Sequence, residues 1–301
     1  MSALLVHRLD GIPDPEQPLT LAIGAFDGLH RGHTAIIAHA RAQGGRVGVL
    51  RFHPHPMRVI RPEEAPPLLC TEARIQALLS QLGVDFHLRL PFSPERAAQE
   101  PEAFLEELHQ CLPGLQGIVV GPDWRFGRRG RGEIHLLRET AVRYGWTVHV
   151  RPETRWQDER ISSTRIRHAV LRGDLPAVEV MLGRPFRLSG TVQRGKQLGR
   201  TLGFPTANFT PEQELLPPAG VYAMTVHTQE QTCMGAGYIT HHPSLVEVHL
   251  LGFSGDLYDH ELAVDLIAFR RPPAPLPDLK QLQRRIEEDV AAIRTLLEGR
   301  Q

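Results

Sequence analysis

The sequence predicts a mixed α/β protein whose pattern changes part-way along the chain. Three observations support this prediction. The first half alternates short apolar runs with helical patterns, the second half shows strand-like alternation without helices between the runs, and the chain ends in an amphipathic repeat. With 301 residues, the chain is long enough for two domains.

In the first half, apolar runs that read as strands alternate with helical patterns. The expected strands are 19–26, 45–52, 84–90, 117–121 and 147–152, and the expected helices are 33–42, 71–83, 102–112, 134–145 and 163–173. Thr71 is the expected N-cap of the second helix, Glu72 lies in its first turn, and Gly83 ends it. Short strands separated by helices form a parallel sheet, so we expect a Rossmann-like domain. In such sheets, ligands bind at the carboxyl ends of the strands.

The second half has a different rhythm. After a short helix at 177–182, strand-like runs follow at 186–193, 220–227, 245–253 and 260–270. This spacing predicts an antiparallel sheet or a small β-barrel. A terminal helix is expected to pack on it through Leu279, Leu282, Ile286, Val290, Ile293 and Leu297. We expect the boundary near Arg184, which gives domains 1–184 and 185–301.

Composition and charge argue against several classes of protein. Lys plus Arg and Asp plus Glu number 34 each, which is unlike a nucleic-acid coat, so no nucleic-acid partner is expected. Cys70, Cys111 and Cys233 are far apart and odd in number, which favours reduced thiols in a cytoplasmic protein. No apolar run approaches the ~18 residues of a membrane helix, and no signal peptide is evident, so no membrane partner is expected. The oligomeric state does not follow from these patterns.

The stretch GAFDGLHRGH, which begins at Gly24, joins the first strand to the following helix. Gly28 permits a tight turn, and His30 and His33 share a face because they are three residues apart. Gly32 removes a side chain where a flat group could approach the backbone. A helix N-terminus attracts phosphate, and two imidazoles stabilise the charge that develops in nucleotidyl transfer. We therefore expect a catalytic phosphate site here rather than two surface histidines.

Three further segments carry anion-binding residues at predicted strand or helix ends. RFHPHP (51–56) has histidines between prolines, GPDWRFGRRGRG (121–132) has arginines among glycines, and ISSTRIR (161–167) has hydroxyls at a helix start. Each segment alone also fits a solvated loop or a simple N-cap. Because all four segments are expected at the ligand edge of one sheet, together they predict one nucleotide pocket.

These four segments resemble, in order and spacing, the motifs of the nucleotidyltransferase module in bacterial bifunctional riboflavin kinase/FAD synthetases. The resemblance spans essentially the whole chain and implies that the first domain adenylylates FMN with ATP, which gives FAD and pyrophosphate. His30 and His33 would stabilise the transferring phosphoryl group. The other implied binding residues are Gly24, Phe26, Asp27, Gly28, Gly32, His55, Asp123, Arg125, Ser162, Ser163, Thr164 and Arg167. Ala25 and Arg51 depart from the family's usual Asn and Thr.

The second half opens with RGKQLGRTLGFPTANF (194–209), a glycine-rich basic loop followed by a hydroxyl and an amide. Backbone N–H groups of such a loop can bind phosphate, and side-chain oxygens can bind Mg²⁺, although a turn-rich hairpin is an equal alternative. The candidate residues are Gly195, Lys196, Gly199, Arg200, Thr206 and Asn208. Glu247 faces away from the valines beside it on an alternating strand, either as a solvent-facing residue or as a general base.

These pieces resemble the riboflavin kinase module of the same family, whose fold is a six-stranded antiparallel barrel. The resemblance implies that Thr206 and Asn208 coordinate the Mg²⁺ of ATP. It also implies that Glu247 deprotonates the 5′-hydroxyl of riboflavin. The stretch 237–249 departs from the family pattern, because Tyr238, Thr240, His242 and Ser244 stand where Asn, Gly, Arg and Thr are usual, and the flap is short.

The predicted function is therefore bifunctional: riboflavin is phosphorylated to FMN, and FMN is adenylylated to FAD. Riboflavin, FMN and ATP are the expected small-molecule partners, with Mg²⁺ as cofactor. One alternative is a FAD synthetase whose kinase-like barrel is catalytically degenerate. Another alternative is an adenylyltransferase for another substrate with a binding barrel, for example one for single-stranded RNA. It is less favoured because a barrel that binds nucleic acid interleaves basic and aromatic residues on its strands, and these strands do not.

Overall fold

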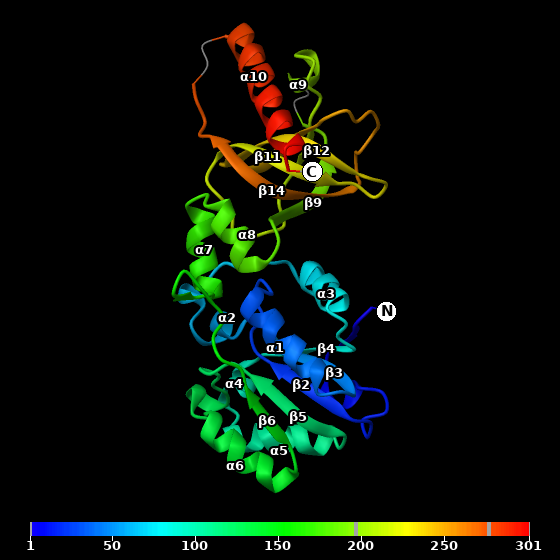
Figure 1. Ribbon diagram of the computed structural model, residues 1–301, viewed down its shortest axis with the longest axis vertical. Helices are drawn as coiled ribbons and strands as arrows, with labels where there is room; N and C mark the ends of the chain where they lie inside the picture. Colours follow the sequence, from blue (N-terminus) through cyan, green and yellow to red (C-terminus); the bar gives the residue numbers. More distant parts are fainter. Residues whose placement is uncertain (1, 196–197, 276–277, 301) are drawn as a thin grey trace. The chain divides into compact units, whose positions relative to one another are not determined.

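The computed structural model describes residues 2–195, 198–275 and 278–300 (Figure 1). The chain divides into two compact units, Met1–Ser162 and Ser163–Gln301. The first unit contains a parallel sheet and the second a closed antiparallel barrel, so the predicted fold class is confirmed.

The first unit is built on a six-stranded parallel sheet. Its strands are β1 (Leu4–Val6), β2 (Leu19–Ile23), β3 (Arg46–His53), β4 (Phe86–Pro91), β5 (Leu115–Val120) and β6 (Thr147–Val150). They lie in the order β1-β4-β3-β2-β5-β6, with every pairing parallel. After β2, the strands β3 and β4 lie on one side of it, and β5 and β6 lie on the other side. Such a change of direction is a switch point, which opens a ligand crevice at the carboxyl ends of the strands.

Helices cover both faces of this sheet. They are α1 (Arg31–Ala42), α2 (Pro56–Ile60), α3 (Glu72–Gln81), α4 (Pro94–Ala98), α5 (Pro101–Cys111) and α6 (Ile134–Tyr144). Short 3₁₀ turns lie at η1 (Leu9–Gly11), η2 (Pro62–Glu64) and η3 (Arg128–Gly130), and β7 (Arg155–Trp156) pairs with β8 (Glu159–Arg160). One core cluster joins α5 and α6 to the sheet, and another joins α1 and α3. Leu21 belongs to the first cluster and Ala22 to the second, as strand alternation requires.

The second unit begins with two helices, α7 (Ser163–Leu171) and α8 (Leu175–Leu182), and continues as a closed barrel. The barrel strands are β9 (Phe186–Gln193), β10 (Ala207–Phe209), β11 (Gly220–His227), β12 (Thr232–His241), β13 (Ser244–Leu250) and β14 (Glu261–Arg271). Their order around the barrel is β10-β13-β12-β11-β14-β9. The helix α9 (Leu198–Thr201) lies in the loop before β10, and α10 (Leu279–Glu298) ends the unit.

The expected terminal helix packs on the barrel. Ile293 and Leu297 of α10 join a buried cluster with Val221 of β11. Asp289, which is buried, accepts a hydrogen bond from the Arg271 guanidinium at 2.6 Å. At the other end of the unit, α8 packs against β9 and β14, and this contact associates the helix pair with the barrel. The domain boundary at 184 stays a prediction.

The main differences from the predicted elements have local causes. β2 ends at Ile23 rather than at Phe26, because Phe26 has a φ of 51° and cannot continue an extended strand. β12 escapes prediction because Gly235 and Gly237 interrupt its pattern, yet a side chain at either position would meet barrel side chains. β1 and β10 have three residues each, which is too short for a periodicity signal.

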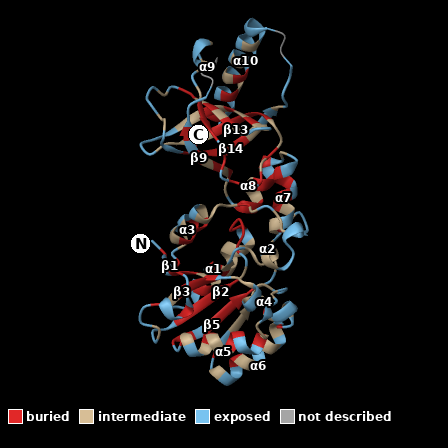
Figure 2. Ribbon diagram, turned by 180° about the vertical axis from the view of Figure 1, so that it is seen from behind, coloured by how far each residue is buried: buried red, intermediate tan, exposed pale blue. Residues whose placement is uncertain are grey.

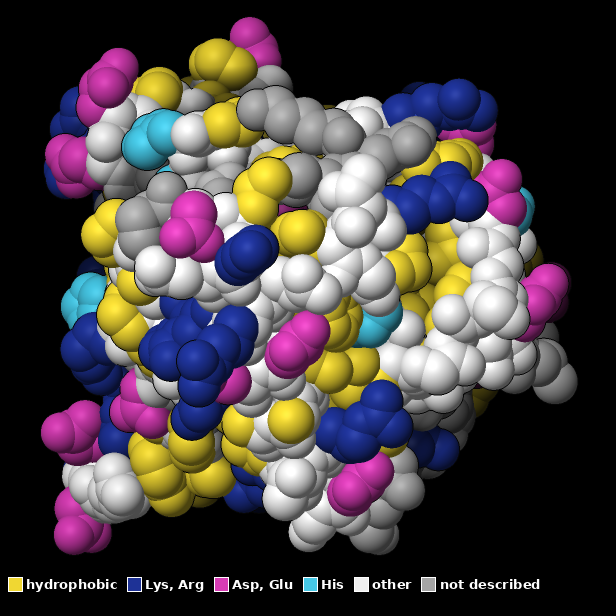
Figure 3. Space-filling view, turned by 90° about the horizontal axis from the view of Figure 1, so that it is seen from above, with side chains coloured by type: hydrophobic (Ala, Val, Ile, Leu, Met, Phe, Trp, Pro, Cys, Tyr) yellow, Lys and Arg dark blue, Asp and Glu magenta, His cyan; other side chains and the backbone are white. Residues whose placement is uncertain are grey.

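Figure 2 shows buried residues concentrated on the strands of both units and on the inner faces of the helices. Figure 3 shows one face of the molecule, on which cationic and acidic side chains are interspersed rather than separated. This mixing gives the visible face no extended field of one sign. Among the described residues, no helix is both long enough and apolar enough to cross a membrane.

Candidate active sites

The loop between β2 and α1 has an unusual backbone. Phe26, Gly28 and Leu29 have φ angles of 51°, 80° and 41°. Non-glycine residues adopt such angles only where surrounding contacts fix them. The side chains of Phe26 and Leu29 are fully buried, and a Cβ at Gly28 would lie 2.7 Å from Leu69 Cδ1. The loop is therefore fixed by packing before any substrate binds.

The two histidines of this loop stack on each other. His30 is the N-cap of α1, and its Nδ1 accepts a hydrogen bond from the His33 backbone N–H at 3.3 Å. The two ring centroids are 3.6 Å apart, with an angle of 15° between the planes. Since Nδ1 of His30 is an acceptor, the neutral ring carries its hydrogen on Nε2. The pair is thus stacked at the start of α1, in the loop that follows β2.

Gly32 serves the histidine pair itself. A Cβ there would lie 3.0 Å from Cε1 of His30, so glycine lets the His30 ring lie flat against the start of α1. The His30 imidazole therefore lies beside Gly32, and contact of Gly32 with a nucleotide stays a prediction. A Cβ at Gly24 would lie 3.4 Å from Cε2 of the Phe26 ring, which is a looser contact.

Asp27 and His55 lie on neighbouring strand exits. Asp27 is only 2% exposed, and its Oδ1 accepts a hydrogen bond from the Leu69 backbone N–H at 2.9 Å. His55 is the N-cap of α2, and its Nδ1 accepts from the Met57 backbone N–H at 3.3 Å. Both predicted site residues therefore have a local structural task, and their contact with a nucleotide stays a prediction.

Three arginines of the loop after β5 and its Asp123 form ion pairs with nearby residues. Asp123 pairs with Arg160, and Arg125 lies 2.8 Å from Glu133. Arg128 and Arg131 both lie close to Glu100, at 3.2 and 3.1 Å. All these pairs are substantially exposed, so each contributes little to stability and can exchange for a phosphate.

An aromatic cluster borders this loop and was not anticipated from the sequence. Trp124 stacks on Phe126 with ring centroids 4.4 Å apart, and Phe126 contacts Phe104 at 6.0 Å. Phe104 in turn contacts Phe52, which packs on Phe92. These rings come from β3, α5 and two loops, so only the folded chain brings them together. Trp124 is half-buried and offers a flat apolar surface at the carboxyl edge.

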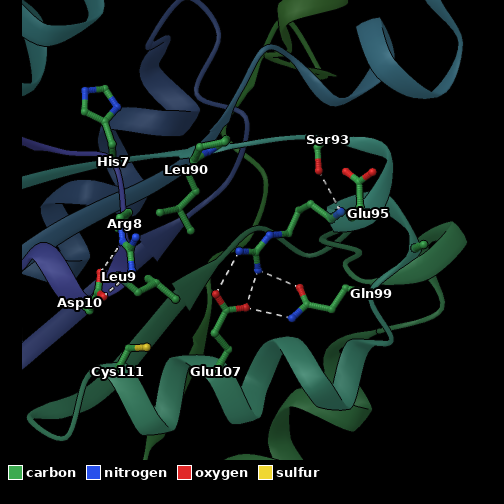
Figure 4. A pocket seen from close by; sticks show the side chains of 13 residues that line it. His7, Arg8, Leu9, Asp10, Leu90, Ser93, Glu95, Gln99, Glu107 and Cys111 are labelled. Carbon is green, nitrogen blue, oxygen red and sulfur yellow. Dashed lines mark hydrogen bonds and ion pairs between the residues drawn. The ribbon is translucent and has the colours of Figure 1, made fainter.

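A cavity of about 660 Å³ lies between η1, the end of β4, α4 and α5 (Figure 4). Arg96 makes paired hydrogen bonds to Glu107 and a further bond to Gln99, and Arg8 pairs with Asp10 at 2.7 Å. None of the predicted site residues lines this cavity. Because its central charges already have partners in the chain, the histidine loop is the better candidate for chemistry.

The remaining predicted residues of the first site lie at the division between the units. Ser162 ends the first unit, whereas Ser163, Thr164 and Arg167 begin the second, on α7. Arg167 is buried. Their contribution to the nucleotide pocket stays a prediction.

The barrel brings Asn208 and Glu247 together. The two residues are opposite each other in the antiparallel pairing of β10 with β13, so their side chains share one face. Val246 and Val248 are fully buried while Glu247 is half-buried, which agrees with the predicted alternation. Oδ1 of Asn208 is buried and has no hydrogen-bond partner among the described residues. A buried acceptor of this kind suits a metal ion, because oxygen ligands are what Mg²⁺ prefers.

The loop before β10 carries the other predicted kinase residues. Thr206 is half-buried, directly before the strand. The preceding carbonyl, that of Pro205, accepts a hydrogen bond from Nδ1 of His249 at 2.8 Å. Gly195 packs closely on the Asn208 amide, while Gly199 and Arg200 lie on α9. Lys196 lies outside the described residues.

Comparisons with known proteins agree with both halves of this description. The family model for FAD synthetase matches residues 12–165, and that for riboflavin kinase matches residues 182–297. A bifunctional riboflavin kinase/FMN adenylyltransferase of Pseudomonas fluorescens is 35% identical over 303 residues, which cover 97% of each chain. The Escherichia coli K12 protein of the same description is 33% identical and covers 94% of each chain. The chain belongs to the bifunctional riboflavin kinase/FMN adenylyltransferase family.

The predicted membership of this family is therefore confirmed, as is the enzyme class. The chain combines an FAD synthetase domain with a riboflavin kinase domain, and ATP and flavins fit as its substrates. A crystal structure described as a macrolide-efflux protein from Streptococcus pneumoniae has a TM-score of 0.85 to this chain. It is 25% identical and covers 98% of this chain and 99% of its own, so the two chains share their fold.

Proposed function

We propose that the first unit transfers the adenylyl group of ATP to FMN at the stacked histidines. The observation that carries this proposal is the His30–His33 pair, fixed at the switch point of a parallel sheet. A phosphate oxygen of FMN attacks the α-phosphorus of ATP, the bond to pyrophosphate breaks, and FAD and pyrophosphate form. The Nε2–H of His30 donates to the phosphoryl oxygens as their charge increases, and His33 supports the same charge.

The flavin ring is proposed to contact the aromatic cluster, with Trp124 as the exposed face. The support is the position of Trp124 three residues after Gly121 at the end of β5, beside the histidine loop of β2 in the sheet order. The backbone N–H of Phe92 also bonds to the carbonyl of His53, at 2.9 Å, and this bond connects the cluster to the His53–His55 turn. Stacking of a planar ring on an indole contributes favourable free energy beyond that of the apolar area it buries.

For the barrel, we propose phosphorylation of riboflavin by Glu247, Asn208 and Thr206. Glu247 accepts the proton of the ribityl 5′-hydroxyl, whose oxygen then bonds to the γ-phosphorus of ATP while ADP departs. Oδ1 of Asn208 and the Thr206 hydroxyl would hold Mg²⁺, which offsets the charge of the ATP phosphates. The unsatisfied, buried Oδ1 of Asn208 supports this role.

A specific observation favours the alternative in which the barrel is degenerate. Two of the altered residues use their hydroxyls in the β12–β13 turn: Thr240 donates to the Pro243 carbonyl at 2.6 Å, and Ser244 donates to the His241 carbonyl at 3.2 Å. Tyr238 packs with the cluster under α10. These residues therefore serve the fold in place of the side chains that the family usually has there.

The test is product analysis with the whole purified chain, ATP and Mg²⁺. Riboflavin is supplied in one assay and FMN in another, each with and without Mg²⁺, and flavins are separated by chromatography. The bifunctional proposal predicts FMN and FAD from riboflavin, and FAD from FMN. FAD from FMN alone would establish the degenerate-barrel alternative, and no FAD from either substrate would contradict the proposed adenylyl transfer.

A further inference from the structure

A short segment at the start of α3 contacts both loops that carry the proposed adenylyl-transfer residues. Two of its members make the contacts, Leu69 and Glu72, and we name them the α3 brace. Leu69 contacts the β2–α1 loop, which carries His30 and His33. Glu72 contacts the end of β3, which leads to His55.

Leu69 contacts the β2–α1 loop through its backbone and its side chain. Its N–H donates to Oδ1 of the buried Asp27 at 2.9 Å. Its side chain covers Gly28, where a Cβ would lie 2.7 Å from Leu69 Cδ1. Leu69 itself is fully buried. These contacts fix the turn that sets the entry of α1 and thus the position of its N-cap, His30.

Glu72 brings together the ends of two strands. Its Oε2 accepts from Arg51 Nη1 of β3 at 2.6 Å and from Arg89 Nη1 of β4 at 3.3 Å. Its Oε1 lies 3.4 Å from Nδ1 of His53, the last residue of β3. Nε of Arg51 also donates to the Ala25 carbonyl in the β2–α1 loop, at 3.4 Å. One carboxylate therefore contacts β3 and β4 directly and the histidine loop through Arg51.

The Arg51 side chain is buried, so the Glu72 carboxylate is its required counter-charge. Burial raises the pKa of Glu72, but the hydrogen bond and charge of Arg51, with His53 and Arg89, outweigh this effect and lower it. His87, which is buried nearby on β4, bonds to Gln76 through Nδ1 at 2.6 Å. Arg51, one of the two departures from the family pattern, therefore contacts the backbone carbonyl of the other, Ala25; this contact does not depend on the side chain at position 25.

We propose that Glu72, through Arg51 and His53, is a positioning residue for adenylyl transfer. It fixes the exits of β2 and β3 relative to each other, so that the histidine pair and the His53–His55 turn face one substrate. Its carboxylate is bound to chain groups and does not touch the reacting atoms. The inference rests on the proposed adenylyl transfer at His30 and His33.

The test compares Glu72→Gln with a matched control, Glu102→Gln. Both glutamates lie in the first turn of a helix of the same unit, but Glu102 is exposed and belongs to no such network among the residues that the structure describes. For Glu72→Gln, kcat for FAD formation from FMN is expected to fall ~10- to 100-fold, because small displacements of reacting groups have costs of this size. KM for ATP and the rate of FMN formation by the barrel should stay within about twofold. Glu102→Gln should change none of these values.

Two results separate positioning from stability and from the parent proposal. All assays are run well below the unfolding temperature of each variant. A second variant, Arg51→Lys, retains the charge at this position and should therefore keep a higher kcat than Glu72→Gln. A lower unfolding temperature for Glu72→Gln with an unchanged kcat would overturn the positioning role while leaving adenylyl transfer in place. If His33→Ala also leaves FAD formation unchanged, the proposed adenylyl-transfer site itself is wrong.

Discussion

The two candidate sites differ in how far the chain itself fixes them. In the first unit, the histidine loop has buried Phe26 and Leu29 in left-handed conformations, and contacts from α3 fix it. In the barrel, Asn208 and Glu247 are fixed by strand register, but the loop that leads to Thr206 is largely exposed. The comparison teaches that packing fixes the histidine loop in advance, whereas the loop before β10 has little packing around it. Under the proposed functions, adenylyl transfer would use a preorganised site and the kinase site would be completed by binding of the nucleotide.

Glu247→Gln should have the largest effect on one activity and none on the other. Removing a general base typically lowers a rate ~10²- to 10⁴-fold, so FMN formation from riboflavin should fall by this amount. FAD formation from supplied FMN should stay unchanged. Initial rates of both reactions, measured on the same preparation, check the prediction. Equal loss of both activities in a folded protein would contradict two separate sites.

His33→Ala should produce the reverse pattern. Loss of one donor to a developing charge typically costs ~10²- to 10³-fold, so FAD formation should fall by this factor while FMN formation persists. The same two initial rates are measured. The stacked partner His30 keeps its N-cap position, and circular dichroism and the unfolding temperature verify that α1 is intact. A variant that still adenylylates FMN at the wild-type rate would remove His33 from the mechanism.

The unit that carries the histidine loop should lose stability in acid. Burial, followed by the charge of Arg51, lowers the pKa of His87 to about 4 from its ordinary value of 6.5. The unfolded chain therefore binds a proton between these values while the folded chain does not, so stability falls as the pH drops from about 6.5 to about 4. The shift corresponds to about 3 kcal/mol in total.

Urea unfolding at pH 7 and pH 5 measures this loss in wild type and in His87→Gln, which cannot titrate. The variant should lose less stability between the two pH values. His135→Gln, at an exposed position on α6, is the control and should behave as wild type. An identical pH dependence for wild type and His87→Gln would show that another group is responsible.

Replacing a glycine should destabilise the histidine loop more than an ordinary helix end. Gly28 and Gly145 have similar φ angles, 80° and 74°, but only a Cβ at Gly28 would meet other atoms, at 2.7 Å from Leu69. Alanine at Gly145 should cost about 1 kcal/mol for the left-handed backbone, and alanine at Gly28 about 1–3 kcal/mol more. Chemical denaturation of both variants measures the difference, and equal costs would contradict tight packing of the loop on α3.

Trp124→Leu should have the smallest effect on the chemistry itself. Loss of a stacking face worth about 0.5–1.5 kcal/mol raises KM for FMN up to about tenfold, while kcat for FAD formation stays nearly the same. KM for riboflavin in the kinase reaction is the internal control and should not change. An unchanged KM for FMN would place the flavin ring elsewhere.

Most of the fold was predictable because its elements repeat apolar residues with clear periods. The helices α1, α3, α5 and α6 and the barrel strands β9, β11, β13 and β14 follow these patterns. β12 was missed because its glycines serve close packing within the barrel and carry no hydrophobic signal. The end of β2 was misplaced because the left-handed Phe26 is stabilised by burial, which local sequence does not encode.

The sequence names candidate reacting groups but not the residues that support them. His30 and His33 are candidates because of their residue type and spacing, and Glu247 because of the family resemblance; their roles stay predictions. Glu72 reads in sequence as an ordinary first-turn acid of α3, and its ionic contacts exist only because β3 and β4 are neighbours in the sheet. The aromatic cluster around Phe126 likewise depends on tertiary contact between distant segments.

The proposed function requires one chain to contain two separate sites, one that forms FMN and one that consumes it. Mixing two inactive variants tests it most directly. Neither His33→Ala nor Glu247→Gln alone should convert riboflavin to FAD at a significant rate, because each lacks one step. In an equimolar mixture with ATP and Mg²⁺, FMN from the His33→Ala protein should be adenylylated by the Glu247→Gln protein, and FAD should accumulate. FAD from either variant alone, or none from the mixture, would contradict the account.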